Sequence, residues 1–192
     1  MSAWPQVEAW IAESARNVEV LPAERGPETL GRLQVSEDSP LGAIALMTGG
    51  ILVDDGWFRI LGGGGDRLPS LAEWGGVGGD ALVEPVDRGL CVAFDAVGGF
   101  FVLLEQTRRV HSFLPDVLDW ADTGLGYSQF VHWTLHGDLD GFYGELRSRE
   151  VAGLPHDRAL SIHEPAGTTR AITELWALYP GGKLRELLEA GA

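Results

Sequence analysis

Residues 51–61 are two apolar runs on either side of a turn, in the order Ile51-Leu52-Val53-Asp54-Asp55-Gly56-Trp57-Phe58-Arg59-Ile60-Leu61. Asp and Gly favour tight turns, because Asp bonds to nearby backbone and Gly accepts positive φ angles. Short apolar runs rich in β-branched and aromatic residues favour strands. The stretch therefore predicts a β-hairpin.

Two further hairpins follow the same pattern. Apolar runs at 90–94 and 100–104 flank a turn that contains Asp95 and Gly98-Gly99. Runs at 110–114 and 117–120 flank Pro115-Asp116. Because antiparallel strands can be joined by short turns, successive hairpins form a meander. We therefore predict an α+β fold with a mostly antiparallel sheet of about six strands.

Helices and shorter strands are expected on both sides of these hairpins. The helical spacing of Val7, Trp10 and Ile11 predicts an N-terminal helix from Ser2 to about Arg16. A second group of helices is expected after the sheet, with Ser128 as its N-cap. The remaining expected elements are strands at 18–21, 41–47 and 159–163, a glycine-rich connection at 62–79, and helices at 27–33, 129–136, 139–149, 170–178 and 183–189.

The length of 192 residues favours one domain. We find no linker long enough to divide the chain. The prediction is a single domain over 1–192, in which residues 151–192 form a C-terminal extension packed on a core of residues 1–150.

The charge balance is strongly acidic. The chain has 14 Lys and Arg against 28 Asp and Glu, a formal net charge of −14. Nonspecific binding to nucleic acid or to anionic membranes requires a basic face, so we expect neither as a partner. A signal peptide and a membrane-length apolar segment are not apparent, and a cytoplasmic location is expected.

The sequence contains no recognisable catalytic or cofactor motif. Gly182-Lys183 lacks the other residues of a phosphate-binding loop, and residues 76–81 match a dinucleotide fingerprint only in a turn-rich context. His132 and His136 have the i, i+4 spacing of two metal ligands on one helix. A helical wheel places both on the polar face, and no third ligand is evident. We expect no cofactor and keep a metal site at these histidines as an alternative.

Acidic residues and aromatic residues cluster around the predicted turns. Turn chemistry and solvation explain many of them, but an acidic docking face with aromatic anchors is the functional alternative. The predicted binding surface consists of Asp54, Asp55, Trp57, Arg59, Asp95, Asp116, Asp119, Trp120 and Tyr127.

Several segments, taken in order, carry a resemblance to a known family. They are Trp4-Pro5, Ser39-Pro40-Leu41-Gly42-Ala43, Thr48-Gly49-Gly50-Ile51-Leu52-Val53, Gly56 to Gly62, Asp95 to Phe101, Pro115 to Trp120, Gly124 to Phe130, and Gly137 to Tyr143. In this order they resemble the bacterial domain-of-unknown-function family 2625. The layout is more distantly similar to the SUKH (Smi–Knr-type) superfamily, many of whose members are immunity proteins that bind and block toxins. That resemblance implies no catalytic residues.

Two hypotheses of function follow. The first is a cytoplasmic protein-binding module, a SUKH-like immunity protein whose acidic turns steer a basic toxin and whose aromatic residues anchor it. The second is a small-molecule-binding protein or enzyme with a pocket near the glycine-rich connection, Trp57 and Arg59.

Overall fold

A computed structural model describes residues 1–191, in which one seven-stranded antiparallel sheet organises the chain. The strands follow one another across the sheet in sequence order. They are β1 (Val18–Leu21), β2 (Gly50–Val53), β3 (Phe58–Leu61), β4 (Gly89–Asp95), β5 (Phe100–Leu104), β6 (Arg109–Leu114) and β7 (Asp119–Asp122). A second sheet pairs β8 (Arg158–Leu160) with β9 (Thr169–Ala171). The α+β fold and the meander are confirmed, with seven strands in the main sheet.

The first predicted hairpin has the expected register. Ile51 pairs with Ile60, and Leu52 pairs with Arg59. Asp54 and Asp55 have φ angles of 51° and 57°, and Gly56 has a φ of 82°. Asp tolerates the left-handed region better than most residues do. The Asp-Asp-Gly sequence is therefore suited to this turn.

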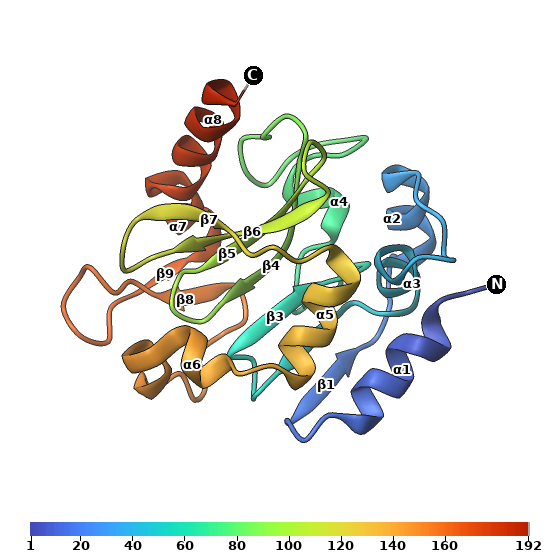
Figure 1. Cartoon of the computed structure of the whole chain (residues 1–192), viewed down its shortest axis with the longest axis horizontal. Helices are drawn as coiled ribbons and strands as arrows, with labels where there is room; N and C mark the ends of the chain where they lie inside the picture. The colour runs from blue at the N-terminus through green and yellow to red at the C-terminus, as the bar shows by residue number, and fades with distance from the viewer. Residues whose placement is uncertain (192) are drawn as a thin grey trace.

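Aromatic side chains fill both faces of the sheet. On one face, Phe58 and Phe101 pack on Phe130 of α5 (Tyr127–His136), with ring centroids 5.9 and 5.3 Å apart. Figure 1 shows α5 in front of the sheet, near α1 (Trp4–Glu13) and α3 (Pro40–Met47). Phe58, Phe101 and Phe130 therefore join this face of the sheet to α5.

The second face is covered by α4 (Leu71–Trp74), α7 (Ile172–Leu178) and α8 (Pro180–Ala190). Phe100 of β5 lies 5.9 Å from Trp74 and 5.2 Å from Trp176, measured between ring centroids. Trp120 of β7 donates a hydrogen bond from Nε1 to the Pro180 carbonyl oxygen at 3.0 Å. Residues after 151 thus contribute side chains to the core.

The expected strand at 41–47 is wrong, because these residues form α3. Ser39 caps this helix by accepting a hydrogen bond from the Gly42 backbone N–H, and Pro40 occupies the first turn. Gly42 to Ala45 are all buried. A buried apolar helix has no polar face, so its sequence shows no helical period.

Other boundaries also differ from the sequence predictions. Helix α5 begins after Gly126, whose N–H donates to the Gln129 side chain, so Ser128 is not the cap. The expected helix 139–149 divides into α6 (Leu139–Tyr143) and a 3-10 helix at Gly144–Ser148, joined where Gly144 has a φ of 53°. Residues 26–33 form α2 (Gly26–Leu33), close to the expectation.

In an antiparallel meander, successive connections lie at alternating ends of the sheet. The β2–β3, β4–β5 and β6–β7 turns therefore share one end of the main sheet, which we call the turn end. Residues 151–171, which we call the strap, run across it. The Leu160 N–H donates to the Ala96 carbonyl oxygen at 2.8 Å, and His163 Nε2 lies 2.5 Å from the Pro115 carbonyl oxygen. Figure 1 shows the strap in orange on the left side of the molecule.

Within the described residues, none of the helices combines the length and apolar character needed to cross a bilayer.

Candidate functional site

The structure places the predicted binding-surface residues in two groups. Asp55, Asp116 and Asp119 are exposed, and Asp54 is partly buried. The others are buried, so including them in a surface is wrong. The buried residues are Trp57, Arg59, Asp95, Trp120 and Tyr127.

Asp95 is buried because its carboxylate organises the β4–β5 turn. Its Oδ1 accepts hydrogen bonds from the N–H groups of Val97 and Gly99, at 2.9 and 2.7 Å. Its Oδ2 accepts one from the Tyr143 hydroxyl at 2.7 Å. Burial raises the pKa of Asp95, and these hydrogen bonds oppose the rise. A structural role in the β4–β5 turn therefore explains why Asp95 is buried.

Arg59 is also buried, with 1% of its surface exposed. Its Nε donates to the Gly56 carbonyl oxygen at 2.8 Å, and one terminal nitrogen donates to the His156 and Arg158 carbonyl oxygens at 2.9 and 2.5 Å. Burial lowers the pKa of this guanidinium to about 10. Arg59 thereby fastens the strap to β3.

Asp54 joins three distant segments. It forms ion pairs with Arg16, at 2.8 Å, and with Arg147. Arg147 also bonds to Asp140 at 2.9 Å and places its guanidinium 4.8 Å from the centre of the Trp57 ring. The acidic turn at Asp54 is therefore partly neutralised by the molecule itself.

The remaining buried aromatic residues do not form surface anchors. Trp120 bonds to Pro180 and packs 6.2 Å from Trp176. Tyr127, at the start of α5, is covered by the fold, and burial raises its pKa. Trp120 follows an acidic turn in the sequence, but it is covered by α7 and α8, which come later in the chain.

His132 and His136 are exposed, as the helical wheel predicted. Their rings stack with centroids 4.5 Å apart, and His136 Nε2 lies 2.9 Å from the Trp10 carbonyl oxygen. Among residues 1–191 there is no group of three or more His, Cys, Asp or Glu placed to hold a metal ion. The pair contacts the N-terminal helix.

A cleft of about 220 Å³ does lie beside the glycine-rich connection. Its lining includes Gly49, Gly65, Arg67 and Leu68. Neither Trp57 nor Arg59 contributes to that lining. This cleft is therefore not the pocket near Trp57 and Arg59 that the second hypothesis described.

A different cavity, which we call the turn-end groove, lies between the turn end, the strap and α7. Its volume is about 260 Å³. Apolar side chains from separate elements form most of it: Val97, Phe113, Leu118, Leu160, Ile162, Leu175 and Leu178. The groove has no signature in the sequence, because its walls are distant in the chain and converge only on folding.

The charged residues that line the groove are Glu164 and Arg170, with His163 beside them, and three further acidic residues are next to lining residues in the sequence: Asp116, Asp119 and Glu174. Glu164 binds the Arg170 guanidinium through two hydrogen bonds of 2.5 and 2.7 Å, which lower the pKa of Glu164 to about 2. Glu174 lies 4.0 Å from the same guanidinium. Asp116 and Asp119 flank the lining residue Leu118 in the β6–β7 turn. We call Asp116, Asp119, Glu164 and Glu174 the groove rim.

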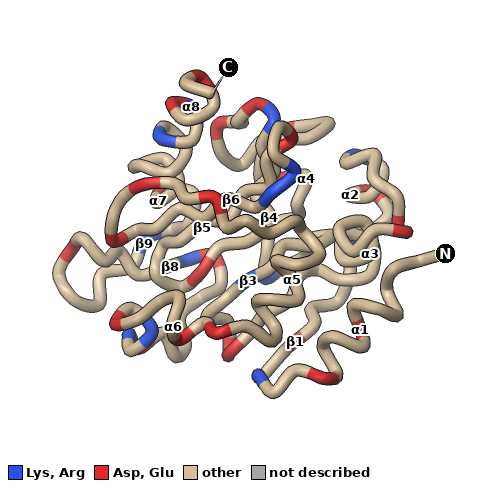
Figure 2. Tube along the Cα trace, in the orientation of Figure 1, with Lys and Arg blue, Asp and Glu red and all other residues tan. Residues whose placement is uncertain are grey.

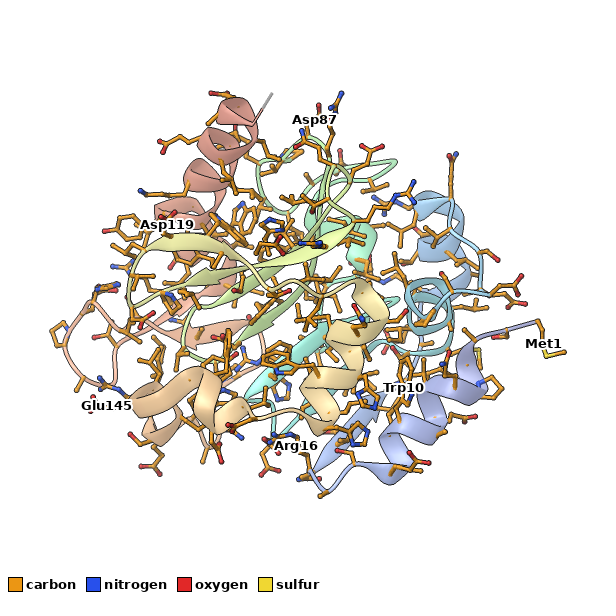
Figure 3. The ribbon with its side chains drawn as sticks, viewed as in Figure 1. Met1, Trp10, Arg16, Asp87, Asp119 and Glu145 are labelled. Atoms are coloured by element: carbon orange, nitrogen blue, oxygen red, sulfur yellow. The ribbon has the colours of Figure 1, made fainter. Side chains whose placement is uncertain are left out.

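The acidic residues are distributed over the surface loops and helix ends, as Figure 2 shows. Ion pairs engage many of the basic side chains: Arg16, Arg25, Arg32, Arg67, Arg109, Arg147, Arg170 and Arg185. Because acidic residues outnumber basic ones twofold, these pairs leave a surplus of carboxylates. Asp119 and Glu145 lie on the side of the molecule that carries the strap (Figure 3).

The fold and its surface define a single α+β domain with a continuous antiparallel sheet and an acid-rimmed apolar groove at one end. The chain belongs to the family described as "Protein of unknown function DUF2625", whose model matches residues 1–172.

Two relatives are similar over most of the chain. "Putative uncharacterized protein YbfG" of Escherichia coli K12 is 34% identical over 204 residues, covering 92% of this chain and 90% of that protein. An "Uncharacterized protein" of Haemophilus influenzae is 31% identical over 153 residues, covering 76% of this chain and 67% of that protein. No solved structure matches the chain significantly.

Proposed function

We propose that this protein is a binding module that captures a basic partner protein at its turn end. The observation that carries the proposal is the groove rim. Glu164 lines the apolar groove together with Arg170, and Asp116, Asp119 and Glu174 each directly follow or precede a lining residue in the sequence. Complementary charge accelerates encounter, and apolar contact then slows dissociation.

The overall charge supports the same partner class. A net charge of −14 attracts a cationic protein from a distance and repels nucleic acid and anionic membranes. Salt at physiological strength screens charges over about 8 Å, so the steering depends on carboxylates near the contact. The groove rim meets this condition.

The titratable groups whose pKa values are shifted by burial favour a binding function over a catalytic one. Asp95 and Tyr143 bond to each other, and Arg59 bonds to backbone carbonyl groups. Cys91 is buried, and burial raises the pKa of its thiol. These groups are enclosed by the fold, whereas a general acid or base must reach its substrate.

The distant resemblance of the sequence to the SUKH superfamily suggests what kind of partner this is. We propose a toxin, which the protein would block by covering its basic active surface in the cytoplasm. Finding a gene for a basic toxin beside the gene for this protein would support this finer proposal, and a neighbourhood without one would count against it.

The test compares three forms of the full chain. Asp116→Lys/Asp119→Lys reverses two exposed charges at the groove rim. Glu8→Lys/Glu13→Lys makes the same change in net charge on exposed positions of α1, on the opposite side of the view in Figure 1. Each form is used to capture proteins from the native host at about 50 mM and about 150 mM salt.

We expect the wild type and the α1 variant to retain the same basic protein, and the rim variant to lose it. Calorimetry with that purified protein should show at least a roughly tenfold weaker Kd for the rim variant, about 1.4 kcal/mol. The proposal is wrong if no captured protein depends on the rim charges. Toxicity of the partner that wild type relieves and the rim variant does not would support the immunity role.

A further inference from the structure

The groove rim adjoins exposed apolar side chains as well as the groove itself. Val117, Leu178 and Tyr179 expose 60%, 49% and 45% of their surface. Val117 lies between Asp116 and the lining residue Leu118, whereas Leu178 and Tyr179 line the groove themselves. Such apolar surface around a pocket is typical of an interaction site.

The groove has room for one side chain of a partner. An apolar cavity of about 150 Å³ accommodates a benzene molecule, and the turn-end groove measures about 260 Å³. Its walls are formed by Phe113 and Leu160 among other apolar residues. A Phe or Leu side chain fits this volume and chemistry, whereas a charged group would lose its hydration there.

The charged residues of the groove rim determine which partner residues can flank the inserted side chain. Arg170 is already held by Glu164, with Glu174 nearby. Asp116 and Asp119 are exposed, and neither has an ion-pair partner among the described residues. A basic residue next to the inserted side chain would complement them.

We infer that the turn-end groove receives a single Phe or Leu side chain of the partner, directly flanked by Lys or Arg. This inference rests on the proposed function and specifies its partner segment. The apolar side chain supplies burial, and its basic neighbours bind the groove rim.

Three synthetic peptides test this recognition by fluorescence anisotropy. The first has the sequence Gly-Arg-Lys-Phe-Lys-Arg-Gly. The second replaces Phe by Ser at unchanged charge, and the third keeps Phe but replaces both Lys and both Arg by Ser. We expect the first to bind at least roughly tenfold more tightly than either of the others, because each lacks one of the two contributions.

Protein variants locate the contact. Leu178→Ser and Val117→Ser change exposed residues beside the groove, so the fold should be retained. Leu187→Ser changes an exposed residue of α8 that does not line the groove. The first two variants should each bind the Phe peptide severalfold more weakly, and the Leu187 variant should bind it with unchanged Kd.

The outcomes separate this inference from the proposed function. Equal binding of the Phe and Ser peptides, or no effect of Leu178→Ser and Val117→Ser, overturns the groove assignment even where the rim variant loses the captured protein. Phe-dependent binding that those two variants weaken supports the groove assignment even where no basic partner is captured.

Discussion

Replacing Tyr143 with Phe removes one buried hydroxyl and keeps the ring that packs 5.6 Å from Trp57. The hydroxyl donates to Asp95 Oδ2 at 2.7 Å, while both backbone donors of the turn use Oδ1. The variant therefore leaves a buried carboxylate oxygen without this donor. Hydrogen bonds to charged groups contribute about 1.5–3 kcal/mol. We expect Tyr143→Phe to lower the free energy of unfolding by about 2 kcal/mol at neutral pH.

This loss should depend on pH in a defined direction. Burial raises the pKa of Asp95 in the folded state above its value in the unfolded chain. Such a carboxyl stabilises the fold below the unfolded pKa, and that contribution is lost as pH rises through the folded pKa. The Tyr143 hydrogen bond lowers the folded pKa of Asp95, so its removal raises that pKa further. The difference between wild type and variant should therefore be small in acid and grow as pH rises.

Urea unfolding at about pH 4.5 and about pH 8, followed by far-UV circular dichroism, measures both effects. A loss of 2 kcal/mol corresponds to a Tm lower by roughly 4–8 °C in a chain of this length. Tyr179→Phe is the matched control, because Tyr179 is exposed. A cost of less than about 0.5 kcal/mol for Tyr143→Phe, the scale of ordinary surface changes, or an equal cost at both pH values would refute the role assigned to this hydrogen bond.

Two further predictions concern the core. Trp176→Ala removes a ring with 3% exposure that packs on Trp74 and Phe100. It should lower the free energy of unfolding by about 3–5 kcal/mol in urea titrations, and a loss under about 1 kcal/mol would show that α7 is not part of the core. Cys91 is buried, and burial raises the pKa of its thiol, so a disulfide reagent such as DTNB should modify it only at the rate of unfolding. Rapid modification of the folded protein would contradict its burial.

Local sequence was sufficient for the parts of the fold that depend on turns. The hairpins could be predicted because residues such as Asp55, Gly56 and Gly98 accept the positive φ angles that tight turns require. Helix α3 could not be recognised because its residues are all apolar and its middle, Gly42 to Ala45, is buried. At that position a short apolar run has the same pattern in a helix and in a strand.

Less of the candidate site could be predicted from the sequence. Asp95 occupies a turn, where Asp is usually solvated, but Tyr143 and the strap enclose it after folding. The turn-end groove combines Leu118, Leu160 and Leu175 from three separate elements. Their sequence separation gives no sign that they converge. The exposed acidic residues of the β6–β7 turn, by contrast, were expected from their sequence.

The bonds between Arg59 and the strap have a consequence for biosynthesis. Arg59 precedes its acceptor at His156 by 97 residues. At about 5–20 residues per second, roughly 5–20 s of translation separate the two. During that interval the guanidinium has neither of its two strap acceptors and requires water in their place. We therefore expect a nascent chain stalled before residue 156 to leave the Arg59 guanidinium hydrated at that end of the sheet.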